Sequence, residues 1–178
     1  RIDANQVIDK RRMSSGRGAI QPAIFTDGPE AASAFFRQTR SNSLPKQIPV
    51  SETKDAGQSW ALASDLAIAN PNSALAVLTL SNGTRLMVLN NIEAGRYRLV
   101  MLMRESHSPQ WQVIQVLEDD ESLANDQRRE FSYPYLISTN GEDAHLAYTW
   151  DRIKIKHVYF PAVWFKHAAS SLNEKEVQ

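Results

Sequence analysis

The stretch TKDAGQSW, from Thr53 to Trp60, places an acid, a glycine and a tryptophan at its third, fifth and eighth positions. A tight turn between strands leaves backbone N–H groups without ladder partners, and a short carboxylate such as Asp55 can accept them. Gly57 supplies a positive φ without steric cost, Trp60 covers the turn, and the hydroxyls of Thr53 and Ser59 can close it. The stretch therefore predicts a self-contained folding unit between two strands, and not a catalytic site.

The composition indicates one ordinary domain with a packed core. The chain has 178 residues, of which 42% are hydrophobic and 22% charged, and its 20 basic and 20 acidic residues cancel. This balance gives no support for nucleic-acid binding or for a polybasic membrane surface, and no apolar run approaches the roughly 20 residues that span a bilayer. The absence of cysteine excludes disulfides, thiol catalysis and cysteine-ligated zinc.

The chain begins at Arg1, without Met and without the pattern of a signal peptide. We therefore expect a piece of a longer protein. The compartment stays open, with a periplasmic or secreted location slightly favoured over the cytoplasm.

Short apolar or alternating runs, separated by turn residues, follow a polar segment at residues 1–18 that we expect to be a linker or loop. The expected strands are Gln21–Thr26, Ala32–Arg37, Gln47–Thr53, Ala74–Leu80, Arg85–Leu89, Tyr97–Met103, Gln112–Leu117, Tyr133–Ser138, His145–Trp150 and Ile153–Phe160. Several turns carry Asp-Gly or Asn-Gly pairs, which suit tight hairpins. We expect a loop or short helix at Asp120–Glu130 and a C-terminal tail at residues 166–178. The segment from Ala162 onward is interpreted as a fraying terminus, with a helix in its middle as the alternative.

The hairpins recur with a weak period, which predicts an all-β chain built of blade-like units. Trp60 and Trp111 are separated by close to the roughly 40–50 residues of a propeller blade. Three units fit, at about 19–65, 70–118 and 130–165, so residues 19–165 are predicted to form part of a β-propeller. A β-sandwich with long loops is the alternative fold.

The opening stretch also resembles the Asp box of sialidases and related propellers, in which Ser/Thr, Asp, Gly, Thr/Ser and Trp stand at fixed places. Thr53, Asp55, Gly57, Ser59 and Trp60 match every defined place. The segment RESHSPQW, Arg104–Trp111, is similar to a decayed second copy in which only the tryptophan survives.

Longer segments resemble the BNR-repeat, sialidase-like family of predicted neuraminidases. GAIQPAIFTDG, ANPNSALAVLTLSNGTRLMVLNN, EFSYPYLIST and AYTWDRIKIKHVYF together cover nearly everything from Gly18 to Phe160. The resemblance is to the C-terminal part of such proteins and implies about three blades of a five- or six-bladed ring. The remaining blades would come from the same gene product or from another chain, because open sheet edges invite pairing.

The resemblance implies a site for an acidic sugar. Guanidinium groups hold a sugar carboxylate through paired N–H···O bonds, and Arg37 and Arg96 resemble two of the carboxylate-binding arginines of the family. Arg40 and Arg98 are neighbouring alternatives. The general acid and a further arginine would lie upstream of this chain.

The same resemblance implies a tyrosine nucleophile, which sialidases use in place of a carboxylate. Tyr133 in FSYPYL stands in that place, with Tyr135 as a rival on the same side of the strand. Gln21 stands where well-characterised sialidases carry a glutamate that takes the phenol proton. Glutamine cannot take that proton at neutral pH, so this departure favours a chain that binds without cleaving.

Further polar and aromatic residues are candidates for sugar contacts. Asn70 and Asn72 in NPNS carry amides suited to sugar hydroxyls or to a plain turn, and Trp150 and Arg152 can form a stacking wall. The four histidines show no metal spacing, so no metal and no cofactor are expected. The sequence thus predicts a sialidase-like glycoside hydrolase acting on terminal acidic sugars, with a non-catalytic carbohydrate-binding propeller, or a hydrolase for another sugar, as the alternative.

Overall fold

A computed structural model describes residues 2–3, 6–7, 10–13, 18–39 and 45–176, with side chains placed between residues 10 and 172 of these ranges. Within them the chain forms two very short strands, β1 (Ile2–Asp3) and β2 (Gln6–Val7), three larger antiparallel sheets and one helix, α1 (Ala162–Glu176).

Each larger sheet is a blade whose strands follow the order of the sequence. The first blade contains β3 (Ala19–Asp27), β4 (Ala31–Gln38), β5 (Gln47–Thr53) and β6 (Ser64–Ala69). The second contains β7 (Ala76–Thr79), β8 (Arg85–Leu89), β9 (Arg98–Arg104) and β10 (Gln112–Asp119). The third contains only β11 (Phe131–Ile137), β12 (Ala144–Trp150) and β13 (Lys154–Phe160).

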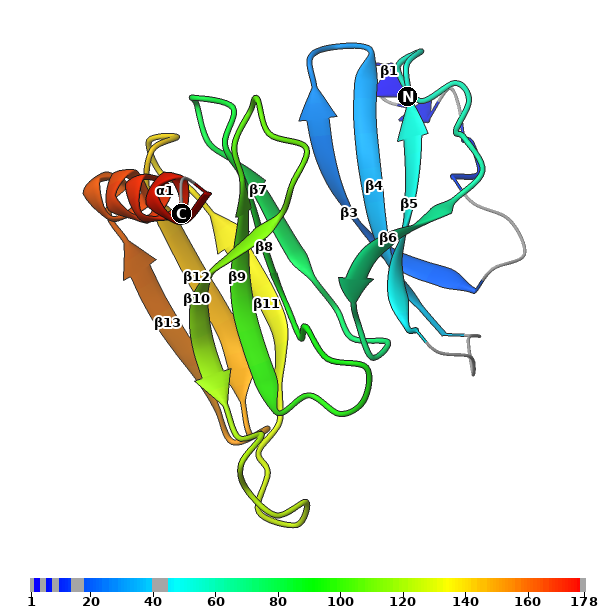
Figure 1. Ribbon diagram of the computed structural model, residues 1–178. Coiled ribbons are helices and arrows are strands. Elements are labelled where there is room, and N and C mark those ends of the chain that lie inside the picture. Colours follow the sequence, from blue (N-terminus) through cyan, green and yellow to red (C-terminus); the bar gives the residue numbers. More distant parts are fainter. Residues whose placement is uncertain (1, 4–5, 8–9, 14–17, 40–44, 177–178) are drawn as a thin grey trace.

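The first strands of the three blades lie next to one another. Strand β7 contacts both β3 and β11, and the remaining strands of each blade extend outward from these inner strands (Figure 1). Three consecutive meander sheets that radiate from a line of inner strands are the arrangement of a propeller. The predicted partial propeller is confirmed, and the alternative of a two-sheet sandwich is wrong.

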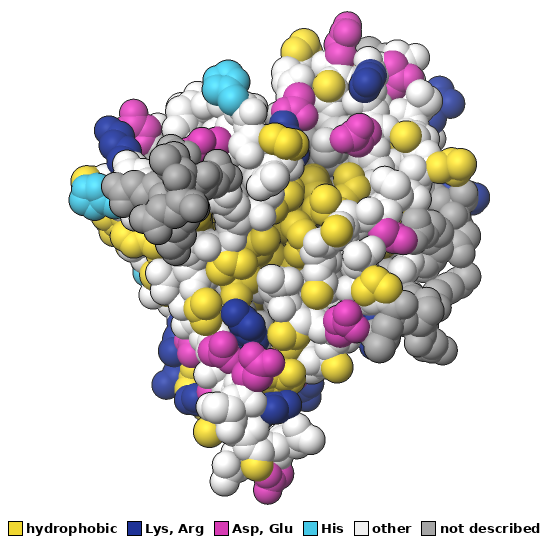
Figure 2. All heavy atoms as spheres, in the orientation of Figure 1, with side chains coloured by type: hydrophobic (Ala, Val, Ile, Leu, Met, Phe, Trp, Pro, Cys, Tyr) yellow, Lys and Arg dark blue, Asp and Glu magenta, His cyan; other side chains and the backbone are white. Residues whose placement is uncertain are grey.

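Two apolar layers hold the blades together. Phe25, Ile48, Met87 and Val100 are among the buried residues between the first and second blades, where Figure 2 shows hydrophobic side chains filling the space between the two sheets. Leu99, Met101, Phe131 and Leu146 lie in the layer between the second and third blades. Burial of each such side chain stabilises the fold by about 1.5–3 kcal/mol.

Trp111, which lies just before β10, belongs to the first of these layers. Its ring centroid lies 5.9 Å from that of Phe25 and 6.3 Å from that of Phe35. Aromatic pairs at this separation add stability beyond the area they bury, so this tryptophan joins two blades.

The turn between β5 and β6 is closed by Asp55. The amide and hydroxyl of Ser59 donate to the Asp55 carboxylate at 2.9 and 2.5 Å, and the hydroxyl of Thr53 donates to it at 2.8 Å. The amide of Gly57, with φ +81°, donates to the Thr53 hydroxyl at 3.0 Å, and the indole of Trp60 lies against this glycine. Short polar side chains thus satisfy a turn that has no ladder partners.

Three features differ from the sequence-based expectations. Strand β6 was not predicted, because its Ser64-Asp65 start and its alanines have weak strand propensity, and it exists by pairing with β5. Residues 162–176 form a helix rather than a fraying tail, since Phe165 and Trp164 pack against the buried Phe160. The segment expected to be a linker contains the short β1–β2 pair.

In the described part of the chain, no helix is long and apolar enough to cross a membrane.

The Asp55 carboxylate predicts an acid-sensitive contribution to stability. Hydrogen bonds from Ser59, and then from Thr53, lower the pKa of Asp55 from 3.8 to about 2. Because the folded-state pKa is depressed, this contribution is present above pH 3.8 and is lost as the pH falls through about 2. We expect Asp55→Asn to lower the urea midpoint of the intact protein at pH 7, and the difference from the parent to shrink between pH 4 and 2. The control Asp126→Asn, in an exposed loop, should have the urea midpoint of the parent at each pH. A difference in midpoint between Asp55→Asn and the parent that does not change with pH would contradict this role.

Candidate functional site

The residues predicted to bind sugar lie at one end of the blades. Gln21 lies near the start of β3 and Arg37 near the end of β4, while Tyr133 lies near the start of β11. Arg96 lies in the loop that joins β8 to β9. In an antiparallel meander the start of the first strand and the end of the second meet at one edge, so all four positions face the end of the molecule that is lowest in Figure 1. We call this end the mouth.

Arg37 joins the first blade to the second through neutral partners. Its Nη1 donates to Oε1 of Gln21 at 2.8 Å, and its Nε donates to Oδ1 of Asn72 at 2.8 Å. Asn72 lies just before β7, so the guanidinium spans the inner strands of two blades. Since both partners are amides, they orient Arg37 without neutralising its charge.

Strained backbone marks the same point in all three blades. Gln21, Asn72 and Tyr133 have φ values of 49°, 67° and 52°. The strand registers shift beside Gln21 and beside Tyr133, as β-bulges do. Left-handed backbone is unusual for a bulky residue such as tyrosine, and strain of this kind collects at functional sites.

Glu130 holds the second group of charges. Its Oε1 accepts from Nη1 of Arg96 at 3.1 Å and from the Ser132 hydroxyl at 2.9 Å, and its Oε2 accepts from Nε and Nη2 of Arg152 at 3.0 and 2.5 Å. Burial works to raise the pKa of Glu130, but these hydrogen bonds and the charge of Arg96 outweigh it and lower the pKa. Glu130 is therefore a carboxylate that fixes two arginines beside Tyr133, whose ring lies 5.5 Å from the Arg96 guanidinium carbon.

Asn90 fixes the backbone around Arg96. This fully buried side chain donates from Nδ2 to the carbonyl of Arg98 at 2.7 Å and to that of Phe131 at 2.9 Å. The amide of Phe131 in turn donates to the carbonyl of Arg96 at 2.8 Å. The arginine loop of the second blade is thus bonded to the inner strand of the third.

Arg152 is presented by a strained turn. Asp151 and Arg152 have φ values of 53° and 54°, the pair of positive values required by a type I′ hairpin. The Asp151 amide donates to the carbonyl of Glu130 at 2.6 Å. This contact ties the β12–β13 turn to the start of β11 and directs Arg152 toward Glu130.

These groups open into a hollow of about 620 Å³. Figure 2 shows Lys and Arg side chains gathered toward this end of the molecule. The lining residues are Pro71, Ala94, Gly95, Arg96, Tyr97, Asn125, Arg128, Arg129, Glu130 and Arg152. Four guanidinium groups against one carboxylate make it suited to an anionic ligand.

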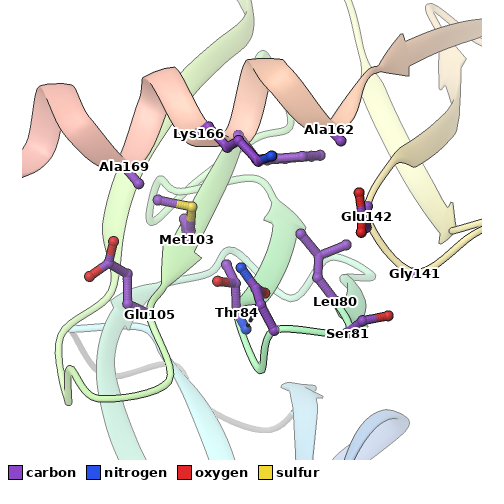
Figure 3. A pocket seen from close by; sticks show the side chains of 12 residues that line it. Leu80, Ser81, Thr84, Met103, Glu105, Gly141, Glu142, Ala162, Lys166 and Ala169 are labelled. Carbon is purple, nitrogen blue, oxygen red and sulfur yellow. Dashed lines mark hydrogen bonds between the residues drawn. The ribbon is translucent and has the colours of Figure 1, made fainter.

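A second hollow of about 420 Å³ lies at the opposite end of the blades, under α1 (Figure 3). Ala162, Phe165 and Ala169 of the helix face Leu80 and Met103 there. Its lining also contains Thr84, Glu105 and Lys166 but none of the residues predicted to bind sugar, so it is separate from the mouth.

Not every predicted residue belongs to the mouth. Asn70 is 3% exposed and its amide is bonded to Ser73, which gives it the role of a turn residue. Trp150 is surrounded by the cations of Arg129, Lys154 and Lys156, which occupy the ring surface that a sugar would need.

The residues named as alternatives to Arg96, Tyr133 and Arg37 have other surroundings or are not described. Arg98 is paired with Asp119 and Glu121, and Tyr135 is exposed on the outer face of the third blade. Arg40 lies outside the described residues.

Sequence reasoning missed Glu130, Asn90 and Arg128. Glu130 precedes the FSYPYL segment and Asn90 follows a predicted strand, but neither residue belongs to a motif. In the described residues no group of three or more acidic or histidine side chains is placed to hold a metal ion.

Comparisons with known proteins agree with this architecture. The sequence profile of the BNR repeat-like domain matches residues 2–146, while no curated protein matches the chain.

Among solved structures, the chain is similar to the alpha-L-arabinofuranosidase Arb93A of Fusarium graminearum bound to an iminosugar inhibitor. The TM-score is 0.59, and the identity is 15% over 82% of this chain and 46% of that one. The alpha-L-arabinanase of Penicillium chrysogenum, bound to arabinobiose, has a TM-score of 0.59 and 13% identity over 81% and 46%. The Hadza microbial sialidase Hz136 has a TM-score of 0.57 and 13% identity over 81% and 28%. The chain therefore spans less than half the length of these solved relatives.

Because Glu130 pairs with two arginines, we expect substitutions of Glu130 and of Arg152 to lower the free energy of unfolding by unequal amounts. Glu130 is 22% exposed and serves two arginines, whereas Arg152 is 76% exposed. We expect Glu130→Gln to lower the free energy of unfolding by about 1–3 kcal/mol, because two guanidiniums lose their counter-charge. Arg152→Gln should lower the free energy of unfolding much less than Glu130→Gln, because solvent screens its pair. Urea denaturation of the intact protein measures both; equal costs would mean that Glu130 does not organise the mouth.

Proposed function

The chain belongs to the family of BNR repeat-like domains, and from this premise we propose that it is part of a glycoside hydrolase of sialidase type that acts on terminal acidic sugars. The observation that carries the proposal is the guanidinium of Arg37, which has no carboxylate partner among the described residues, at the same mouth as Arg96 and Tyr133. A carboxylate placed between the two arginines would receive charge-assisted bonds.

In this proposal Tyr133 is the nucleophile. Its phenolic oxygen would attack the anomeric carbon as the glycosidic bond breaks and would lose its proton to a base outside these residues, while the leaving oxygen would take a proton from an acid that also lies outside them. The side chain is 52% exposed and rests beside Arg96.

Non-catalytic sugar binding is the second candidate, and Gln21 favours it. The Gln21 amide is bonded to Arg37, and an amide cannot accept the phenol proton. The carboxylate that lines the hollow, Glu130, already accepts four hydrogen bonds. A hydrolase for a different sugar is a further form of the same proposal, since the similar solved structures include enzymes named for arabinose-containing glycans.

We propose that further blades complete the ring, from the same gene product or from another chain. The third blade has three strands where the others have four. Its outer face exposes Tyr135, Ile137, Ile155 and Tyr159. An open edge beside an apolar face favours association with another sheet.

Turnover of a fluorogenic sialoside by the full-length protein tests the hydrolase. We expect Tyr133→Phe to lower kcat by more than about a hundredfold while sugar binding persists, because only the nucleophile is removed.

Arg37→Gln should weaken the binding of the acidic sugar about 10- to 100-fold, which corresponds to the loss of a charge-assisted bond. Lys54→Gln, which removes an equal charge at the far end of the first blade, is the control. No turnover by the parent, together with sugar binding, would favour the non-catalytic candidate; parent-like binding by Arg37→Gln would refute the site.

Size-exclusion chromatography of the isolated 178 residues tests the missing blades. We expect elution well above the 20.0 kDa of one chain, because the open face of the third blade pairs with other copies. Ile155→Lys should reduce this association, whereas Lys54→Gln should not. A stable monomer without exposed apolar surface would contradict the proposed ring.

A further inference from the structure

Resting on the proposed function, we propose that the hollow beside Arg96 binds a second anionic group of the glycan through Arg128. The preferred ligand would then be an oligosaccharide that carries acidic groups on more than one sugar. A single terminal acidic sugar needs only the carboxylate site at Arg37 and Arg96.

Arg128 is held in place by neutral groups. Its Nε donates to the carbonyl of Leu123 at 3.0 Å, and its Nη2 donates to the carbonyl of Glu121 at 2.7 Å. The guanidinium carbon also lies 4.1 Å from the centre of the Tyr97 ring. These contacts fix the orientation of the planar group and leave Nη1 for a ligand.

The loop that carries Arg128 is itself well bonded. Asp120, which is 3% exposed, accepts from the amide, Nε and Nη2 of Arg129 at 3.0, 2.8 and 2.5 Å. The amide of Asp120 donates to the carbonyl of Tyr97 at 2.9 Å, and that of Leu123 donates to the carbonyl of Asp120 at 3.0 Å. The loop is thus fastened to the second blade, and little side-chain freedom would be lost on binding.

The charges around the hollow do not balance. Arg96 and Arg152 share Glu130, and Arg129 is paired with Asp120. Among the described residues, Arg128 has neither a salt bridge nor a hydrogen bond to a carboxylate. The other acids of this loop do not line the hollow, and Asp119 and Glu121 face Arg98. One guanidinium therefore remains for an anion from outside.

The position of Arg128 suits a neighbouring sugar of the same chain. The lining that contains Arg128 also contains Arg96, and it contains Pro71 next to the Arg37 partner Asn72. Its volume of about 620 Å³ lies within the range of sites for ligands larger than one sugar. A uronate carboxylate and a sulfate ester both match a guanidinium fork, so the shared requirement is an anionic oxygen group.

Isothermal titration calorimetry on the full-length protein tests the second anion. The Tyr133→Phe background prevents cleavage of the ligands. These are N-acetylneuraminic acid and its α2,8-linked trimer, galacturonic acid and its trimer, a sulfated trisaccharide and a neutral arabinan trisaccharide. The added variants are Arg128→Gln and the charge-matched control Lys54→Gln.

We expect an acidic trimer to bind at least about tenfold more tightly than its monomer, the increment of one charge-assisted contact. Arg128→Gln should remove most of this gain and change monomer binding less than twofold, whereas Lys54→Gln should change neither. Tighter binding of the sulfated trisaccharide with the same dependence on Arg128 would assign the group to sulfate. Equal binding of monomer and trimer, or an Arg128→Gln variant that keeps the gain, would overturn the second subsite and leave the proposed function standing. Binding of the neutral arabinan alone would overturn both.

Discussion

The buried amide of Asn90 bonds the second blade to the third, and the arrangement of the mouth depends on this contact. One Nδ2 group serves the carbonyls of Arg98 and Phe131, on either side of the gap between blades. The bond from Phe131 back to Arg96 completes the connection. Because these short hydrogen bonds all end on main-chain carbonyls, they set the position of Arg96 relative to Tyr133 more strictly than apolar packing alone.

The arginines at the mouth are of two kinds, those paired with a carboxylate and those bonded to neutral groups. Arg96 and Arg152 share the single carboxylate of Glu130, whereas the partners of Arg37 among the described residues are the amides of Gln21 and Asn72. Fixed but uncompensated cations favour an anionic ligand, since they need no reorganisation when it binds. The amide of Gln21, which leaves Arg37 charged, cannot accept a phenol proton, so the proposed hydrolysis would need a base from outside these residues.

Much of the fold was predictable from the sequence, because turns and alternating strands are local signals. The stretch from Thr53 to Trp60 identified the β5–β6 turn through residues that bond one another, and β5 and β8 were predicted with their observed bounds. Strand β6 was missed, and helix α1 was only an alternative for the middle of the tail, because tertiary contacts, and not propensity, determine both elements. In the site, Arg37 and Arg96 were found by resemblance, but Glu130 and Asn90 act through partners far away in sequence, and a single sequence carries no sign of such pairs.

A crystal structure of the intact protein soaked with a terminal acidic sugar tests the central claim most directly. The account predicts that the carboxylate oxygens lie about 3 Å from guanidinium nitrogens of both Arg37 and Arg96, with the anomeric carbon toward the Tyr133 hydroxyl. A sugar bound under α1, or one at the mouth whose carboxylate touches neither arginine, would contradict it.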